Sequence, residues 1–181
     1  DDFPLDFDKD YMKYRGIELH GRTAGIVGLG NNGSAIAERC AGLGMDVVYW
    51  SRSSTNKAYK QAELDELFKS ADVIFPTYSK NPKTNALITD ELLASTKPST
   101  MIIDIIELDD KRDTILDMVK NGKLFGYGFE AKPSSFNDYQ GNVWAAPAYA
   151  WATDGSMNNA MKKWIENMIN ATRGDFTNRV N

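Results

Sequence analysis

Three glycines with the spacing G-x-G-x-x-G, namely Gly28, Gly30 and Gly33, are the residues best placed to bind a ligand. Because glycine has no side chain, such a loop lets backbone N–H groups approach a pyrophosphate, and its third glycine lets the next helix pack on the preceding strand. Asn31 and Asn32 fall within this loop, just before the predicted helix, whose amino end presents unpaired N–H groups and a dipole that favour negative charge. The spacing predicts a bound dinucleotide, with a purely structural glycine turn as the alternative.

The segments on either side of these glycines have the properties that the motif requires. Residues 23–27 are a short apolar run with β-branched side chains, typical of a buried parallel strand. Residues 34–43 repeat apolar side chains on one helical face, and residues 46–50 form a second apolar run. Strand, glycine loop, helix and strand together predict one βαβ unit.

Strand-like and helix-like segments continue to alternate along the rest of the chain. Further strands are predicted at residues 71–75, 100–106, 124–129 and 143–146, and further helices near residues 64–68, 90–94, 111–120 and 154–173. This order predicts an α/β fold: a Rossmann-type doubly wound parallel sheet in three layers, α/β/α.

The last of these helices has the clearest apolar periodicity. Asp154 is predicted to cap its amino end, and Gly174 to stop it. A period of 3.6 residues places seven apolar side chains on one face: Met157, Ala160, Met161, Trp164, Ile165, Met168 and Ile169. We interpret this stripe as part of the hydrophobic core rather than as a ligand site.

Composition narrows the class of protein. The 181 residues are 42% hydrophobic and 25% charged, with a net charge of −4, which fits one globular α/β domain and provides no basic surface for nucleic acid or membrane. Cys40 is the only cysteine, so no disulfide framework is possible and a cytoplasmic location is expected. His20, the only histidine, precedes the first strand in a predicted turn, and we predict neither a catalytic histidine nor a metal site.

The amino end of the chain differs from the rest. Residues 1–16 mix acidic and aromatic side chains ahead of the first strand, which predicts an arm or linker that packs on this domain or on a partner. Residues 17–181 are predicted to form the nucleotide-binding domain. Because the chain begins at Asp1 without a methionine, we expect it to be a piece of something longer.

With this order of motifs, residues 14–181 resemble the nucleotide-binding domain of the D-2-hydroxyacid dehydrogenases, the family of glyoxylate/hydroxypyruvate reductases and phosphoglycerate dehydrogenases. The resemblance is carried by residues 18–23, 64–67, 70–74, 82–88, 121–126, 150–153 and 178–181. It implies an oxidoreductase-type domain that binds NAD or NADP, and a homodimer formed through this domain and its leading arm. It also implies a separate substrate domain, which this chain lacks.

The same resemblance bears on catalysis. Family members hold the substrate carboxylate with an arginine and protonate the carbonyl oxygen with a histidine that a glutamate orients. Here Glu107 stands at the arginine position and Ala148 at the histidine position, and residues 131–136 contain no acid. Arg112 is a candidate for a displaced substrate arginine. We therefore assign no catalytic residue.

Cofactor choice depends on the end of the second strand, where NAD-binding members carry an acid. This sequence has Ser51, Arg52 and Ser53 instead. Arginine can pair with a 2′-phosphate, so NADP is predicted, with NAD as the alternative because some relatives with a Ser-Arg pair use it. An exposed arginine that touches no ligand is a further alternative. The resemblance also implies cofactor contacts for Thr77 and, near the nicotinamide carboxamide, for Glu130.

Three functions remain open from the sequence. The first is an NAD(P)-binding domain of a D-2-hydroxyacid dehydrogenase-like protein in which the usual catalytic groups are replaced. The second is a working oxidoreductase on a 2-hydroxy or 2-keto acid that uses a different acid and has lost its substrate domain. The third is a non-catalytic structural or interaction module in which cofactor binding has lapsed.

Overall fold

The computed structural model describes residues 16–131 and 139–176. The described residues form two compact units: residues 16–130 with 139–145, and residue 131 with 146–176. The last helix belongs to the second unit.

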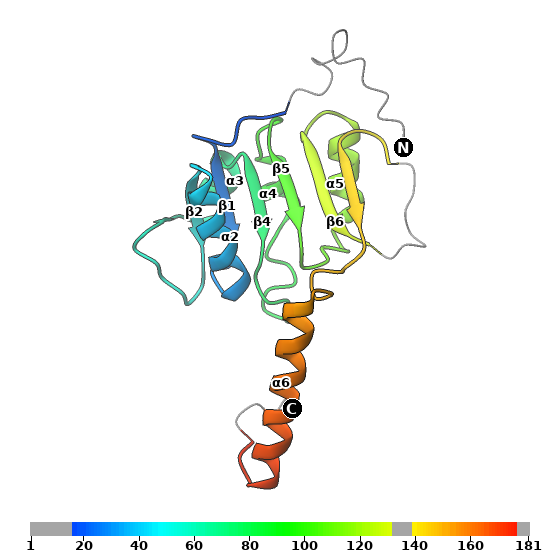
Figure 1. Ribbon diagram of the computed structural model, residues 1–181. Coiled ribbons are helices and arrows are strands. Elements are labelled where there is room, and N and C mark those ends of the chain that lie inside the picture. The colour runs from blue at the N-terminus through cyan, green and yellow to red at the C-terminus, as the bar shows by residue number, and fades with distance from the viewer. Residues whose placement is uncertain (1–15, 132–138, 177–181) are drawn as a thin grey trace, which may run out of the picture. The chain divides into compact units, whose positions relative to one another are not determined.

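A seven-stranded sheet organises the first unit, in the order β3-β2-β1-β4-β5-β6-β7 (Figure 1). Its strands are β1 Thr23–Val27, β2 Asp46–Trp50, β3 Lys60–Gln61, β4 Val73–Pro76, β5 Met101–Asp104, β6 Gly126–Glu130 and β7 Val143–Ala146. The pairs from β3 through β6 are parallel. The chain winds outward from β1 in one direction and then from β4 in the other, which confirms the predicted doubly wound Rossmann-type sheet.

Helices cover both faces of this sheet. They are α2 Asn31–Gly42, α3 Leu64–Ser70, α4 Asp90–Ala94 and α5 Arg112–Lys120. α2 lies on one face and α3, α4 and α5 on the other, which confirms the three layers (Figure 1). The strands are apolar because both faces are covered: Ile26, Ile74 and Ile102 are at most 1% exposed.

Close packing of α3 on β1 depends on a missing side chain. A Cβ atom at Gly25 would lie 2.7 Å from Cδ2 of Leu67 and 2.8 Å from Cβ of Ala71, so only glycine fits at the centre of this strand. Cys40 on α2 is buried, as expected for a small apolar filler.

Some sequence predictions need correction. β3 was not predicted, because a strand of two exposed residues has no apolar pattern to detect. β4 begins at Val73 rather than at residue 71, and β5 ends at Asp104, two residues before the end of the apolar run.

α6, Asp154–Thr172, belongs to the second unit and corrects two further predictions. Its N-cap is Thr153, whose Oγ1 accepts a hydrogen bond from the Ser156 N–H at 3.2 Å, and Asp154 is the first helical residue. None of its residues is buried, which contradicts the prediction that its apolar stripe is core: all of the stripe except the half-buried Ala160 is exposed, with Trp164 at 66%. Gly174, at φ +80°, follows the helix as predicted.

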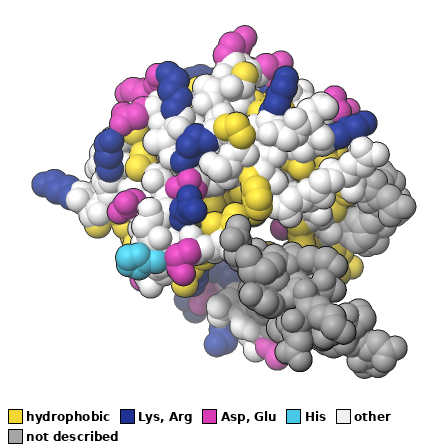
Figure 2. Space-filling view, turned by 90° about the horizontal axis from the view of Figure 1, so that it is seen from above, with side chains coloured by type: hydrophobic (Ala, Val, Ile, Leu, Met, Phe, Trp, Pro, Cys, Tyr) yellow, Lys and Arg dark blue, Asp and Glu magenta, His cyan; other side chains and the backbone are white. Residues whose placement is uncertain are grey.

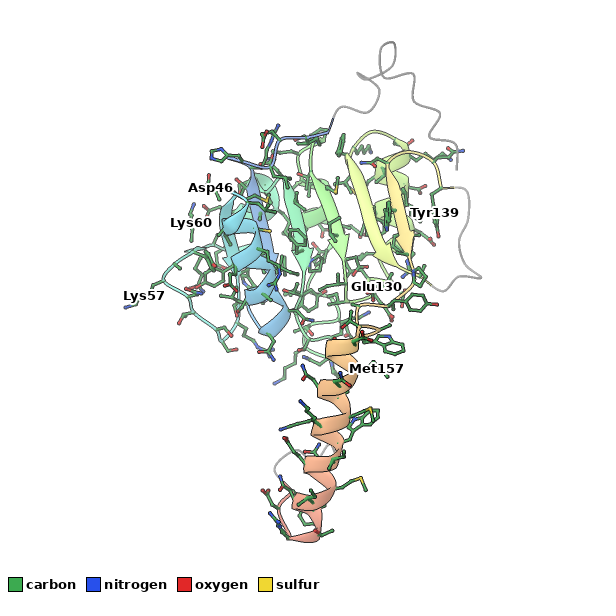
Figure 3. All side chains as sticks on the ribbon, in the orientation of Figure 1. Asp46, Lys57, Lys60, Glu130, Tyr139 and Met157 are labelled. Atoms are coloured by element: carbon green, nitrogen blue, oxygen red, sulfur yellow. The ribbon has the colours of Figure 1, made fainter. Side chains whose placement is uncertain are left out.

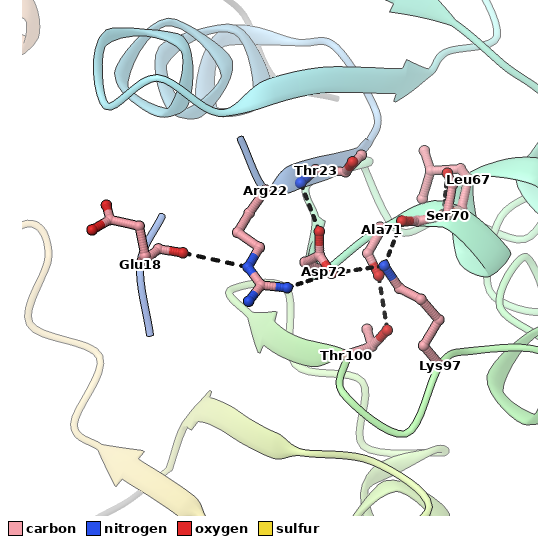
Figure 4. A network of polar contacts seen from close by, with 9 residues as sticks. All are labelled: Glu18, Arg22, Thr23, Leu67, Ser70, Ala71, Asp72, Lys97 and Thr100. Carbon is pink, nitrogen blue, oxygen red and sulfur yellow. Dashed lines mark hydrogen bonds and ion pairs between the residues drawn. The ribbon is translucent and has the colours of Figure 1, made fainter. Parts of the chain in front are cut away.

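An ionic network joins β1 and β4 at the amino ends of the strands (Figure 4). The Asp72 carboxylate accepts hydrogen bonds from the Thr23 N–H at 2.8 Å and from Nζ of Lys97 at 2.7 Å, and Arg22 lies 3.7 Å away. Figure 2 looks onto this edge of the sheet, where positive and negative side chains are interspersed. The network thus ties neighbouring strands on the side of the sheet away from the glycine loop.

This network predicts a loss of stability in acid. Burial alone would raise the pKa of Asp72, but the hydrogen bonds from Lys97 and Thr23 and the charge of Arg22 outweigh it and lower the pKa below its usual value. The carboxylate therefore stabilises the fold above the pKa of an unfolded aspartate, and this contribution disappears as the pH falls through the lowered pKa. Urea unfolding of wild type and Asp72→Asn at pH 7 and pH 3 should show a smaller difference at pH 3; an equal difference would contradict the network.

Candidate functional site

A cleft of about 160 Å³ opens at the carboxyl ends of the strands, where the loops after β1, β2 and β4 meet. It is lined by Gly28, Leu29, Gly30, Trp50, Ser51, Arg52, Ser53, Ser54, Thr77, Tyr78, Ser79 and Thr84. β1 and β4 are neighbours from which the chain winds in opposite directions, so the cleft lies at the point where open α/β sheets bind ligands.

Two glycines of the loop lie against neighbouring protein atoms, and the third faces open space. Gly28 has φ +103°, and a Cβ there would lie 2.7 Å from the Tyr78 backbone nitrogen; a Cβ at Gly33 would lie 2.0 Å from the Gly28 carbonyl oxygen. A Cβ at Gly30 would meet no protein atom within 4 Å. Gly28 and Gly33 therefore allow the loop to close on its neighbours, while Gly30 leaves backbone open to a ligand.

The amino end of α2 lies directly behind this open backbone. Gly30 is the N-cap residue, no side chain caps the helix, and Asn31 and Asn32 are exposed in the first turn. The first-turn N–H groups have no partner within the helix, so they offer hydrogen bonds and partial positive charge to an anion. The arrangement suits a pyrophosphate.

The loop after β2 supplies hydroxyl groups and one cation. The Ser54 N–H donates to Oγ of Ser51 at 3.1 Å, which curls residues 51–54 around the cleft. Arg52 is exposed, and it makes no ion pair with any residue in the described part of the chain. Its guanidinium, beside Ser51 and Ser53, can pair with an anionic group.

Thr77 connects the loops after β1 and β4. Its backbone N–H donates to the Val27 carbonyl at 2.9 Å, and its hydroxyl donates to the Gly28 carbonyl. Thr77 lines the cleft, and these bonds show that its side chain also fixes the position of the glycine loop.

The structure brings together six of the ten predicted cofactor residues: Gly28, Gly30, Ser51, Arg52, Ser53 and Thr77. Asn31 and Asn32 lie beside the cleft on α2, and Gly33 lies beneath the loop. Glu130 is not in the cleft; it lies at the carboxyl end of β6, three strands from β1 (Figure 3).

Sequence reasoning missed several lining residues. Trp50, Ser54, Tyr78 and Ser79 all follow or end a strand, so the rule that ligands bind at the carboxyl ends of strands could have identified them. Thr84 had no such signal: it is buried, and its hydroxyl donates to the Ser79 carbonyl at 2.7 Å within an irregular loop.

The lining of the cleft contains few titratable groups. Among the residues that line it, only Arg52 carries a charge, and only Tyr78 carries a phenol. Burial, together with the nearby carboxylates of Asp110 and Asp104, raises the pKa of Tyr78 to about 12, so the phenol keeps its proton at neutral pH. His20 lies in a turn at the opposite edge of the sheet, against Gly44.

Two further residues singled out in the sequence lie after β5. Glu107 is exposed and has φ +58°, the only positive φ of a non-glycine residue in the part of the chain that the structure describes. Arg112 pairs with Asp109 at 2.6 Å, and its guanidinium stacks 4.9 Å from the Phe129 ring centroid. Arg112 is therefore held by structural contacts, which disfavours a role as a displaced substrate arginine.

Neither a metal centre nor a membrane span is found in the described residues. They hold no group of three or more His, Cys, Asp or Glu side chains placed to bind a metal ion. None of their helices is both long and apolar enough to cross a bilayer.

Comparison with known proteins finds a matching family over most of the chain. Residues 6–144 match the D-isomer specific 2-hydroxyacid dehydrogenase, NAD binding domain. Glyoxylate reductase from Thermococcus onnurineus is 30% identical over 177 residues, which cover 91% of this chain and 52% of that protein. The chain thus spans about half the length of the curated relatives that it matches.

Solved structures share the fold. An acyclic imino acid reductase in complex with NADPH and D-Arg superposes with a TM-score of 0.80 at 22% identity, covering 98% of this chain and 62% of that one. The NAD complex of a D-isomer specific 2-hydroxyacid dehydrogenase from Lactobacillus delbrueckii ssp. bulgaricus gives a TM-score of 0.77 at 21% identity, over 96% and 61% of the two chains.

Proposed function

Because the chain belongs to the D-isomer specific 2-hydroxyacid dehydrogenase family through its NAD-binding domain, we propose that its cleft binds a nicotinamide dinucleotide while the usual catalytic arginine, glutamate and histidine are replaced. The observation that carries the proposal is the glycine loop: Gly30 exposes backbone to the cleft, in front of an uncapped helix. The pyrophosphate would bind there, with the adenosine end toward Ser51 and Arg52.

The residues at two positions oppose the catalysis that is usual in the family. A carboxylate at Glu107 would repel an anionic keto acid where family members attract it; at 4 Å and an effective dielectric near 20, one charge pair is worth about 4 kcal/mol. Alanine at position 148 has no proton to donate, which costs a typical factor of roughly 10² to 10⁴ in rate. Both predict a domain that binds cofactor without reducing a keto acid by itself.

The proposed cofactor is NADP. Arg52 has no ion-pair partner among the described residues, and the loop offers hydroxyl groups rather than a carboxylate. A guanidinium can pair with a 2′-phosphate through two parallel hydrogen bonds. Both cofactors occur among structures of this fold, one with NADPH and one with NAD.

Arg52→Ala is expected to weaken NADPH binding about tenfold or more and to leave NADH binding within about twofold, because hydrogen-bonded charge pairs contribute about 1.5–3 kcal/mol. Fluorescence titration measures both affinities. Lys57→Ala is the matched control: Lys57 lies in the same loop, is not part of the cleft, and points away from the sheet (Figure 3). Equal losses for both cofactors would remove the argument for the 2′-phosphate.

The same titration tests the proposed function as a whole. Saturable binding of NADPH, with no oxidation on addition of glyoxylate, is the expected result. Absence of binding by either cofactor would favour the structural module, and oxidation of bound NADPH would favour a working oxidoreductase. The homodimer, the separate substrate domain and the cytoplasmic location stay predictions, tested by the mass of the particle in solution, by pull-down and by fractionation.

A further inference from the structure

The loops after β4 and β5 hold a lysine and a glutamate next to the candidate cofactor cleft. Lys80 follows Thr77, Tyr78 and Ser79, which line the cleft, and its Nζ donates a hydrogen bond to the backbone carbonyl of Glu107 at 2.5 Å. The two residues are 27 positions apart in sequence, yet this bond brings their loops together at the carboxyl edge of the sheet.

Both charges are available to a ligand. Lys80 and Glu107 are exposed, and within residues 16–131 and 139–176 neither side chain forms an ion pair. Of the neighbouring cations, Lys111 pairs with Asp90 and Arg112 with Asp109, whereas Lys83 resembles Lys80 in having no ion pair among the described residues. The carbonyl of Glu107 uses one of the three donors of the Lys80 ammonium, so two donors remain.

The backbone at Glu107 is held in an uncommon conformation. A φ of +58° is rare for a residue with a side chain, and such residues are enriched at functional sites. The surrounding loop is fixed by the buried Asp104 carboxylate, which accepts hydrogen bonds from the N–H groups of Ile106 and Leu108. The glutamate is therefore presented on a loop whose backbone is anchored on both sides.

We propose that Lys80 and Glu107 form a subsite for a small zwitterion, a 2-amino acid or the corresponding 2-imino acid, beside the bound dinucleotide. The ammonium of Lys80 binds the ligand carboxylate, and the carboxylate of Glu107 binds the ligand nitrogen. A simple hydroxy acid would bind the same cation, but it would place a neutral hydroxyl group, rather than a positively charged nitrogen, beside the carboxylate of Glu107. This inference rests on the proposed function, because the ligand lies next to the cofactor.

The experiment compares alanine, as both enantiomers, with lactate, which replaces the ammonium by a hydroxyl. Protein saturated with NADPH is titrated with each ligand, and amide shifts of residues 79–81 and 105–108 are followed by NMR. At least one alanine enantiomer is expected to bind about fivefold more tightly than lactate, the scale of one exposed charge pair of about 1 kcal/mol. Lys80→Gln should weaken both ligands, and Glu107→Gln should remove the preference for alanine.

Lys83→Gln is the matched control, since Lys83 is an exposed lysine in the same irregular loop and is not bonded to Glu107. It should leave both titrations unchanged. Lactate binding as tightly as alanine, no saturable shift with either ligand, or unchanged binding in Lys80→Gln would each overturn the subsite. NADPH binding is measured first and separately. If the protein binds NADPH but shows no subsite, this inference is overturned while the proposed cofactor binding is not.

Discussion

Gly30→Ala is expected to weaken dinucleotide binding about 10- to 100-fold without lowering the melting temperature. The added methyl group meets no protein atom within 4 Å, and φ −83° is ordinary for alanine, so the substitution should cause neither a steric clash nor backbone strain. The methyl group instead occupies the space into which a pyrophosphate must approach the backbone, and overpacking of this kind costs about 1–3 kcal/mol. NADPH titration and thermal unfolding measure the two effects separately.

Two further alanine substitutions sharpen this test. Gly33→Ala places a Cβ 2.0 Å from the Gly28 carbonyl oxygen, so it should lower both affinity and melting temperature. Gly42→Ala makes the same chemical change at the other end of α2, where nothing lies within 4 Å, and should leave binding intact. Unchanged affinity in Gly30→Ala would mean that the pyrophosphate does not bind at this loop.

Asp104→Ala is expected to destabilise the protein by about 3 kcal/mol or more. Asp104 is 1% exposed at the end of β5, and its carboxylate accepts hydrogen bonds from the Ile106 N–H at 3.0 Å, the Leu108 N–H at 2.8 Å and the Tyr127 hydroxyl at 3.0 Å. Its removal leaves two buried donors and one partly buried donor without a partner, and each such loss costs about 1–3 kcal/mol. Urea unfolding gives the change in free energy.

Two variants separate the hydrogen bonds from the charge. Asp104→Asn keeps one acceptor oxygen and should lose less stability than Asp104→Ala. Asp109→Ala removes an exposed acid of the same loop whose only described partner is Arg112, and should change stability little. If Asp104→Ala has the same midpoint urea concentration of unfolding as wild type, the stability of the loop after β5 does not depend on this carboxylate.

The parts of the fold that could be predicted are those in which the periodicity and turn residues of a segment agree with its place in the folded domain. β1, the glycine loop, α2 and β2 follow one another with matching periodicity and turn residues, and β1 and β2 have the predicted bounds. The stripe on α6 shows the limit of this reasoning: a 3.6-residue period reveals an apolar face, but what covers that face depends on contacts that the period does not encode.

The candidate site was predictable to the same extent. Ser51, Arg52 and Ser53 could be placed because they end a strand next to the glycine loop. The bond between Lys80 and Glu107 could not, since it joins two irregular loops after neighbouring strands. The second role of Thr77 was likewise hidden, because a hydroxyl that reaches the Gly28 carbonyl across 49 residues leaves no local signature.

The short β3 at one side of the sheet has a consequence for solubility. An outermost strand with unpaired backbone groups can recruit a strand from another molecule and start aggregation. Here that strand is only Lys60–Gln61, both exposed, and the lysine is held by Glu66 at 2.6 Å. Because this edge strand is so short and carries a charge, it offers few backbone groups with which a strand of another molecule could pair. On this side, therefore, the sheet is not readily extended.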